Sequence, residues 1–313
     1  MNVSLCDVDG HHFPNLALMK LSAWHKAQGD TVEWYEPLLS NPDRIYASKV
    51  FTFSPDAEFA PCHPEPIRGG TGYRLYNDLP PEIDSMLPDY SVYPQFKFAI
   101  GFLSRGCVRN CPWCVVPRKE GKIRQYDDVE RLAQDRKWLV LMDNNFLAND
   151  FEFVKEQLEK VQRNGYKIDF NQGLDARLVT PENAELLAKC KWKGFTRRQD
   201  AKSHSYIRFA CDTMSAFEPV AYAVKMVRSA GYKGEFSVYV LAKEVDDTLI
   251  RIEKLLALDK KLNPVVMPYR NLDGDGKIVD PQVAKLANWC NKVSERKSCE
   301  WKDYKYKLKE VGK

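Results

Sequence analysis

Three cysteines, Cys107, Cys111 and Cys114, lie in one short run of the chain, and an aromatic residue, Trp113, directly precedes the last of them. Thiolates are soft ligands, and three of them on one loop can hold three irons of a cubane iron–sulfur cluster. The fourth iron then receives no protein ligand from this run. An open metal position is a place for chemistry, as it is in catalytic zinc sites. The run therefore predicts a metal centre with one position open to a second molecule.

Two other interpretations of the run are a zinc site and a group of buried cysteines. Structural zinc usually takes four ligands in two close pairs, and the sequence places neither a His nor a second close pair of cysteines near this run. Arg105, Gly106, Arg109 and Asn110 make the run polar and turn-prone, unlike a core segment. The cluster interpretation is favoured for these reasons.

The spacing CxxxCxΦC, with Trp113 as the aromatic Φ, resembles the signature of the radical S-adenosylmethionine (SAM) enzymes, and the resemblance covers roughly residues 96–280. It implies a [4Fe-4S] cluster on Cys107, Cys111 and Cys114, with SAM chelating the open iron through its amino and carboxylate groups. A one-electron donor such as a flavodoxin or ferredoxin would reduce the cluster. Reductive cleavage of SAM would then give a 5′-deoxyadenosyl radical that abstracts a hydrogen atom from an unidentified substrate.

Six strand-like apolar runs follow residue 96 and alternate with helical patterns. The predicted strands are residues 98–104, 138–143, 167–172, 206–211, 235–241 and 264–268, and four of the predicted helices are residues 150–164, 180–189, 216–230 and 247–259. Six βα units predict a parallel sheet curled into a partial (β/α)6 TIM-like barrel over residues 95–280. Active sites of such barrels lie at the carboxyl ends of the strands, and the cysteine run directly follows the first strand.

Polar side chains follow several of these strands. Besides Trp113, the residues predicted to contact SAM are Asp143, Asn144, Asn145, Gln172, Asp175, Arg177, Arg208 and Asp212. Relatives commonly carry a GGE-like stretch after the second strand that receives the SAM ammonium. Here the oxygens of Asp143 and Asn145 can accept that hydrogen bond, or these residues can cap a helix. Arg177 can clamp the SAM carboxylate or pair with Asp175, and residues 269–271 can complete the mouth of the barrel.

Residues 1–94 are predicted to be a small, truncated Rossmann-like α/β domain followed by a proline-rich linker. Strands are expected at residues 3–8, 31–34 and 49–54, with a helix at 14–25. The domain resembles the cobalamin-binding-like domain ahead of the barrel in one radical SAM subgroup. Asp9 and His11 begin the D-x-H-x-x-G pattern of a cobalt-ligating histidine, but Pro14 replaces its glycine. Bound cobalamin is the less favoured alternative, although the glycines of residues 69–73 would let a ligand approach the backbone.

Composition limits the class of protein. Nine irregularly spaced cysteines in 313 residues do not form a disulfide framework, so a reducing, cytoplasmic location is expected, and no apolar run is long enough to span a bilayer. A net charge of +4 does not by itself indicate nucleic acid. Basic and aromatic residues do alternate in residues 189–198 and in the basic C-terminal helix and tail, residues 281–313, which keeps nucleic acid open as a partner.

Two alternative functions stay open beside the radical SAM interpretation. One is an RNA-modifying, methylthiotransferase-like radical SAM protein, and the other is a non-catalytic metal-binding protein that binds nucleic acid. The six cysteines outside the run match no compact ligand set, which counts against a second cluster of the methylthiotransferase kind. We expect these six to be single cysteines.

Overall fold

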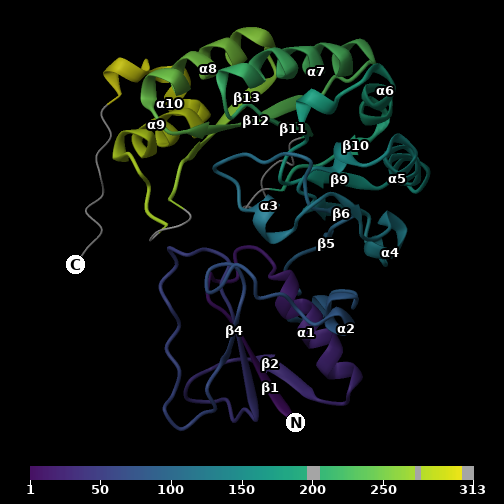
Figure 1. Ribbon diagram of the computed structural model, residues 1–313, viewed down its shortest axis with the longest axis vertical. Helices are drawn as coiled ribbons and strands as arrows, with labels where there is room; N and C mark the ends of the chain where they lie inside the picture. Colours follow the sequence, from purple (N-terminus) through teal and green to yellow (C-terminus); the bar gives the residue numbers. More distant parts are fainter. Residues whose placement is uncertain (196–204, 272–275, 305–313) are drawn as a thin grey trace.

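The computed structural model describes residues 1–195, 205–271 and 276–304, and they form a mixed α/β fold with several parallel sheets. Figure 1 shows the N-terminal sheet in the lower part of the molecule. The upper part contains two further parallel sheets, with long helices on their outer side. The predicted α/β class is therefore confirmed.

The N-terminal sheet has the strand order β2-β1-β3-β4, with each neighbouring pair parallel. Its strands are β1 (Asn2–Asp7), β2 (Thr31–Trp34), β3 (Arg44–Ser48) and β4 (Ile67–Gly69). Helix α1 (Leu16–Ala27) begins where the side chain of Asn15 accepts a hydrogen bond from the amide of Leu18, and it buries Leu18 and Met19. The predicted succession of strand, helix and strand is confirmed for β1, α1 and β2.

The strand predicted at residues 49–54 is wrong, because the strand lies just before this segment, in β3, where Ile45 is buried. Phe51 and Phe53 remain about half exposed, and their rings stack at 5.2 Å. The carboxylate of Asp9 accepts hydrogen bonds from the amide of Phe51 and from that of the preceding residue. The side chain of Asp9, which is distant in the sequence, therefore stabilises this segment as a loop, although its apolar pattern is typical of a strand.

The upper part contains the six predicted parallel strands, with their bounds shifted by a few residues at most. One sheet has the order β10-β9-β8-β5 and the other has the order β11-β12-β13. The strands are β5 (Ala99–Gly101), β8 (Trp138–Leu141), β9 (Lys167–Phe170), β10 (Lys191–Trp192), β11 (Tyr206–Ala210), β12 (Glu235–Ala242) and β13 (Leu262–Pro268). The short edge strand β10 was not predicted, since its basic residues are typical of a surface loop.

The first predicted strand of this part is interrupted. After β5, the chain forms β6 (Ser104–Arg105), which pairs antiparallel with β7 (Arg124–Gln125). The cysteine run lies between these two short strands. It is therefore a loop closed at its base by a two-stranded ribbon, which we call the cysteine loop (residues 106–121).

Helices follow most of the strands, and the four helices predicted between strands are among them. Besides α1, the helices are α2 (Pro81–Asp84), α3 (Val116–Lys119), α4 (Val129–Ala133), α5 (Phe151–Arg163), α6 (Pro181–Lys189), α7 (Phe217–Ser229), α8 (Val245–Leu258), α9 (Pro281–Asn291) and α10 (Val293–Ser298). The start of α6 is a capping box, in which the side chains of Thr180 and Asn183 each accept the other residue's backbone N–H. In the C-terminal region, α9 packs against β13 and buries Leu286 and Trp289.

The two upper sheets meet at the end of β9. Leu174 forms an isolated parallel bridge with Phe209 of β11, and the amide of Leu174 donates to the carbonyl of Arg208 at 2.8 Å. The guanidinium of Arg208 binds both carboxylate oxygens of Asp169, at 2.7 and 2.9 Å, and both side chains are buried. A hydrogen bond and a buried ion pair thus join the sheets at one seam.

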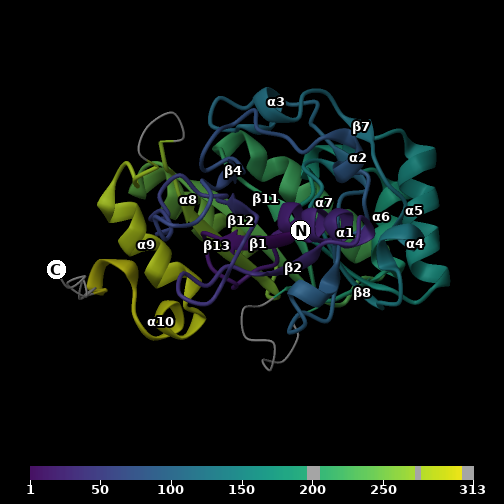
Figure 2. The same cartoon turned by 90° about the horizontal axis from the view of Figure 1, so that it is seen from below.

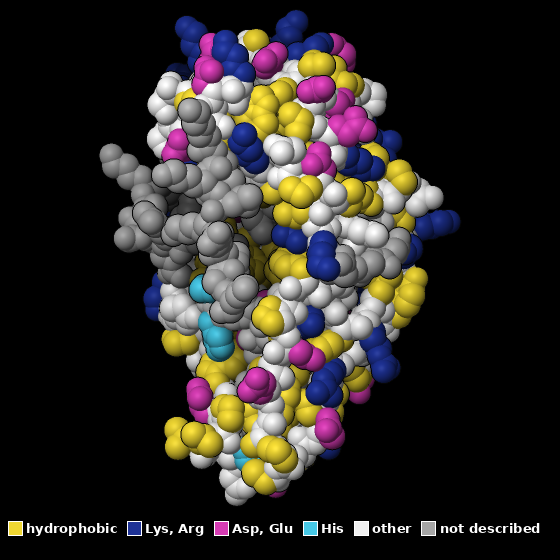
Figure 3. All heavy atoms as spheres, turned by 90° about the vertical axis from the view of Figure 1, so that its left-hand side faces the viewer, with side chains coloured by type: hydrophobic (Ala, Val, Ile, Leu, Met, Phe, Trp, Pro, Cys, Tyr) yellow, Lys and Arg dark blue, Asp and Glu magenta, His cyan; other side chains and the backbone are white. Residues whose placement is uncertain are grey.

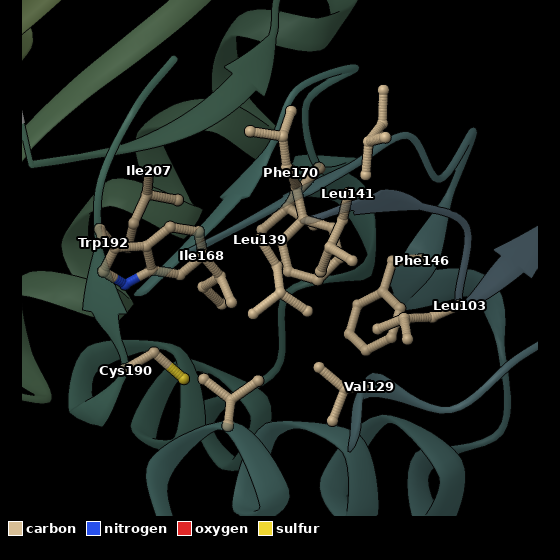
Figure 4. Close-up of a cluster of buried hydrophobic side chains, with 14 of the residues drawn as sticks. Leu103, Val129, Leu139, Leu141, Phe146, Ile168, Phe170, Cys190, Trp192 and Ile207 are labelled. Carbon is tan, nitrogen blue, oxygen red and sulfur yellow. The ribbon is translucent and has the colours of Figure 1, made fainter. Parts of the chain in front are cut away.

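The main hydrophobic core lies between the upper sheets and their helices. Figure 4 shows side chains of β8 and β9, among them Leu139 and Ile168, pointing toward the helices below them. The rings of Phe146 and Phe170 stack at 4.6 Å in this core, and both are buried. This packing fixes the carboxyl ends of β8 and β9, from which several candidate residues emerge.

The N-terminal part contacts both ends of the succession of strands in the upper part. Figure 2, seen from below, shows the N-terminal part in front of the upper part. The ring of Phe13 packs on Phe98, next to β5, at 6.1 Å, while the ring of Phe53 lies 3.9 Å from the guanidinium carbon of Arg270, after β13. Figure 3 shows hydrophobic and histidine side chains at the level where the two parts meet. Within the described residues, no helix is both long and apolar enough to cross a membrane.

Candidate functional site

The three thiols of the cysteine loop are half-buried. The thiol of Cys107 accepts a hydrogen bond from the amide of Arg109 at 3.3 Å, and the amide of Cys114 donates to the carbonyl of Cys111 at 3.0 Å in a tight turn. Burial raises the pKa of Cys111 and of Cys114, and the charge of Cys107 acts in the same direction on both. In the described part of the chain, no three Cys, His, Asp or Glu side chains lie together as a site for a metal ion.

Backbone contacts at the base of the cysteine loop fix where it begins. Gly106 has a φ of +89°, and a Cβ at this position would come within 2.2 Å of the carbonyl oxygen of Lys122. The amide of Cys107 donates to the carbonyl of Gly121 at 3.1 Å across the ribbon. Only glycine fits this close approach in a left-handed conformation, so the ribbon and the first thiol are positioned together.

Asp143 and Asn144, which follow β8, hold the strand that enters the loop. The carboxylate of Asp143 accepts hydrogen bonds from the amides of Leu103 and Ser104, at 3.0 and 2.6 Å, and the amide oxygen of Asn144 accepts one from Gly106 at 3.0 Å. Burial raises the pKa of Asp143 to about 6, against the effect of these donors. Both residues therefore have a positioning role that the sequence did not indicate.

Asn145 is the candidate residue whose side-chain hydrogen bonding is incomplete. Its side-chain nitrogen lies 3.4 Å from the thiol of Cys107 and 3.4 Å from a carboxylate oxygen of Asp175. Its side-chain oxygen is buried and has no hydrogen-bond partner. A buried acceptor without a donor costs about 1–3 kcal/mol, so such atoms are rare in native proteins. A donor from a bound molecule would satisfy it.

Asp175 joins the cysteine loop to the loop after β9. Its carboxylate accepts hydrogen bonds from Arg109 Nε at 2.9 Å and from Arg177 Nε at 2.7 Å. Burial opposes ionisation of Asp175, but the two guanidinium groups outweigh it and lower its pKa. One carboxylate thus faces two guanidinium groups whose side chains are 34% and 43% exposed.

Arg208 and Gln172 lie differently. The guanidinium of Arg208 is engaged with Asp169 at the seam and also donates to the phenol oxygen of Tyr239 at 2.8 Å. Gln172 is exposed at the end of β9. Arg208 is therefore part of the scaffold between the sheets, while Gln172 is free to face solvent or a ligand.

A second group of side chains surrounds Trp113 at the ends of the last three strands. Burial raises the pKa of Asp212, to which the side chain of Trp113 donates a hydrogen bond. The ammonium of Lys243, which follows β12, lies 4.8 Å from the Trp113 ring and 4.7 Å from the Tyr269 ring. Reasoning from the sequence missed Lys243 and the role of Arg109. The position of Lys243 directly after a predicted strand was the signal that could have found it.

Two described rings of the basic aromatic segments pack against the rest of the protein. Trp192 is buried, and Trp301 packs on Trp289 at 5.9 Å. Residues 196–198 and 305–313, which belong to these segments, lie outside the described residues. Of the N-terminal candidates, His11 packs on Trp34 at 4.2 Å between ring centroids. These contacts give the rings structural roles.

The candidate site therefore collects side chains from the cysteine loop and from the loops after β8, β9, β11, β12 and β13. All of these strands are parallel to their neighbours, so their carboxyl ends lie at one edge, as expected for ligand sites in α/β proteins. No model of a known protein family matches this chain, and no curated protein matches it. Its function has to be inferred from the geometry of this edge.

Proposed function

We propose that this chain is a radical SAM enzyme that uses a [4Fe-4S] cluster and SAM to abstract a hydrogen atom from a substrate. One observation carries the proposal: the thiol of Cys107, the first of three on one loop, lies 3.4 Å from the side-chain nitrogen of Asn145, whose buried side-chain oxygen is an acceptor that lacks a donor. Two guanidinium groups, those of Arg109 and Arg177, share the carboxylate of Asp175 nearby. The group thus offers soft ligands, an acceptor and a cation to one bound molecule.

The arrangement of the strands supports a partial (β/α)6 barrel as the fold of residues 95–280. The six strands β5, β8, β9, β11, β12 and β13 are each parallel to the next, with the isolated bridge from Leu174 to Phe209 completing the succession. The N-terminal sheet, with its parallel order β2-β1-β3-β4, supports a truncated Rossmann-like domain. In this proposal, the N-terminal part covers the open side of the barrel through Phe13 and Phe53.

The donor set fits the two cofactors. Cys107, Cys111 and Cys114 would hold the cluster, and Asn145 would accept a hydrogen bond from the SAM ammonium. Arg177 and Arg109, whose side chains are 43% and 34% exposed, would bind the SAM carboxylate. When bound and reduced by a one-electron donor, the cofactors supply the radical that abstracts hydrogen.

The remaining residues of the site orient and shield these groups. Asp143 and Asn144 fix the entry of the cysteine loop through backbone amides. Trp113 and Tyr269 flank Lys243 and give one side of the site an aromatic wall with a cation in it. Such a wall would exclude water from one side of the site, while Lys243 and the exposed Gln172 remain available to the substrate.

The N-terminal residues do not fit cobalamin. A Cβ at Gly70 would come within 2.3 Å of the carbonyl oxygen of Lys49, and one at Gly72 within 2.9 Å of the same atom. These glycines therefore allow close packing of the chain on itself, and the ring of His11 is engaged by Trp34. Cobalamin is therefore not part of the proposed function.

Anaerobic purification followed by iron, sulfide and zinc analysis tests the metal site. With SAM and dithionite, the iron-loaded protein is expected to release 5′-deoxyadenosine, and the Cys111→Ala variant is expected to release none. Zinc without iron or sulfide, or equal release by both proteins, would refute the proposal. The matched control is Cys290→Ala, which removes a buried thiol that lies between α9 and β13, far from the cysteine loop, and should retain activity.

A further inference from the structure

Arg105 and Glu120 close the cysteine loop from its two ends. Arg105 immediately precedes the loop, and Glu120 lies near its end, directly after α3. The guanidinium donates to both carboxylate oxygens of Glu120 at 2.8 Å, with side-chain exposures of 15% and 9%. This bidentate ion pair lies beside the ribbon formed by β6 and β7, so it holds the two arms of the loop together.

The same guanidinium is bound by the N-terminal part. Its third nitrogen donates to Asp84, at the end of α2, at 3.2 Å. Lys20 of α1, which is only 7% exposed, donates to the other carboxylate oxygen of Asp84 at 2.9 Å. The phenol of Tyr126, which follows β7, donates to Asp84 at 2.6 Å. A network of alternating charges thus runs from α1 through α2 to the base of the cysteine loop.

A second contact ties the returning arm of the loop to the N-terminal part. The ammonium of Lys119, at the end of α3, donates to the carbonyl of Leu75 and to the carboxylate of Asp78, both at 2.9 Å. Leu75 and Asp78 belong to the segment between β4 and α2. Both ends of the cysteine loop are therefore attached to residues before position 94.

We propose that the N-terminal α/β part positions the three thiols through this partly buried ionic network, with Arg105, Glu120 and Asp84 as positioning residues. That this network positions the thiols for a cluster rests on the proposed function. That it orders the cysteine loop does not depend on the proposed function. Removing one partner of a buried ion pair leaves the other charge buried and unpaired, which is strongly unfavourable. A bidentate pair also permits few geometries, so the network selects one arrangement of the loop.

Amide hydrogen exchange of the metal-free protein, kept reduced and anaerobic, tests the ordering. Glu120→Gln and Asp84→Asn are each expected to raise exchange at the bonded amides of the loop, such as those of Cys107 and Lys119, by about tenfold or more. Exchange in α5 should stay unchanged. The matched control is Glu65→Gln, which breaks an exposed pair with Arg68 and should leave the loop as in wild type.

The second readout is the rate at which a chelator removes iron from the reconstituted protein, expected to rise at least severalfold in both variants. If Asp84→Asn leaves both exchange and iron loss at the wild-type level, the N-terminal part does not position the loop, whatever the cluster does. If wild type binds no iron, the proposed function fails, while the exchange data still decide the positioning role. Asp84 is 28% exposed, so its variant is expected to fold even if Glu120→Gln does not.

Discussion

Because the side-chain oxygen of Asn145 is unpaired, we predict that replacing Asn145 will raise the stability of the protein and weaken the binding of SAM. In the Asn145→Leu variant, a side chain of similar shape replaces a buried amide whose oxygen has no partner. Leaving that acceptor unpaired costs wild type about 1–3 kcal/mol. The side-chain nitrogen of Asn145 donates to Cys107 and Asp175 at 3.4 Å in each case, which is longer than an ordinary hydrogen bond, so each of these interactions contributes less than about 1 kcal/mol.

Relieving the unpaired oxygen outweighs the loss of these two weak hydrogen bonds. The free energy of unfolding of the metal-free Asn145→Leu protein, measured by urea denaturation, should therefore exceed that of wild type by roughly 1 kcal/mol. SAM binding to the cluster-loaded protein, measured by anaerobic calorimetry, is expected to weaken. Because a hydrogen bond from an ammonium contributes about 1.5–3 kcal/mol, the dissociation constant should rise by about tenfold to a hundredfold.

Asn144→Leu is the matched control, since its oxygen is satisfied by the amide of Gly106. This variant should lose about 1 kcal/mol or more, because it leaves that backbone donor unpaired. The reasoning would be refuted if Asn145→Leu were destabilised as much as Asn144→Leu. Unchanged SAM affinity in a stabilised Asn145→Leu protein would separately remove Asn145 from the binding site.

Three further predictions concern the scaffold. Asp169→Ala leaves Arg208 buried without its carboxylate partner, so the free energy of unfolding in urea should fall by about 3–5 kcal/mol. A loss below about 1 kcal/mol would show that this ion pair does not stabilise the contact between the two upper sheets. Burial raises the pKa of Asp7 to about 6. The folded state therefore favours the protonated carboxyl of Asp7. The free energy of unfolding of wild type relative to Asp7→Asn should decrease by about 2 kcal/mol as the pH rises from about 4 to about 6. A difference between the two proteins that does not change with pH would argue against this burial. Gly106→Ala should lower stability by about 2 kcal/mol or more and reduce bound iron, because its Cβ would meet the Lys122 carbonyl at 2.2 Å; full iron content would exclude a role for this turn.

The strands of the upper part could be predicted because local sequence specifies them. Apolar runs such as those of β8 and β12 are buried on both faces, and residues such as Thr180 mark the helix starts. Residues 49–54 show the limit of this approach. Their alternating pattern is that of a strand, but Phe51 and Phe53 remain exposed and Asp9 supplies the hydrogen bonds.

The sequence predicted which residues follow the strands and so lie near the candidate site, but not which of their polar groups bind one another. The motif singled out Cys107, Cys111 and Cys114, and the strand-end rule selected Asn145, which lies beside Cys107 and Asp175. Which polar groups bind one another depends on long-range pairing. The sequence therefore did not reveal that Asp143 is occupied by backbone amides, or that Arg208 pairs with Asp169 inside the sheet.

The contact between Phe53 and Arg270 has a consequence for how the protein is made. Its partners lie near opposite ends of the chain, and contacts of such long sequence separation form late in folding. On the ribosome, the cysteine loop and its supports before residue 127 emerge well before the segment after β13 can meet Phe53. The cysteine loop and these supports can therefore become ordered before Phe53 and Arg270 meet.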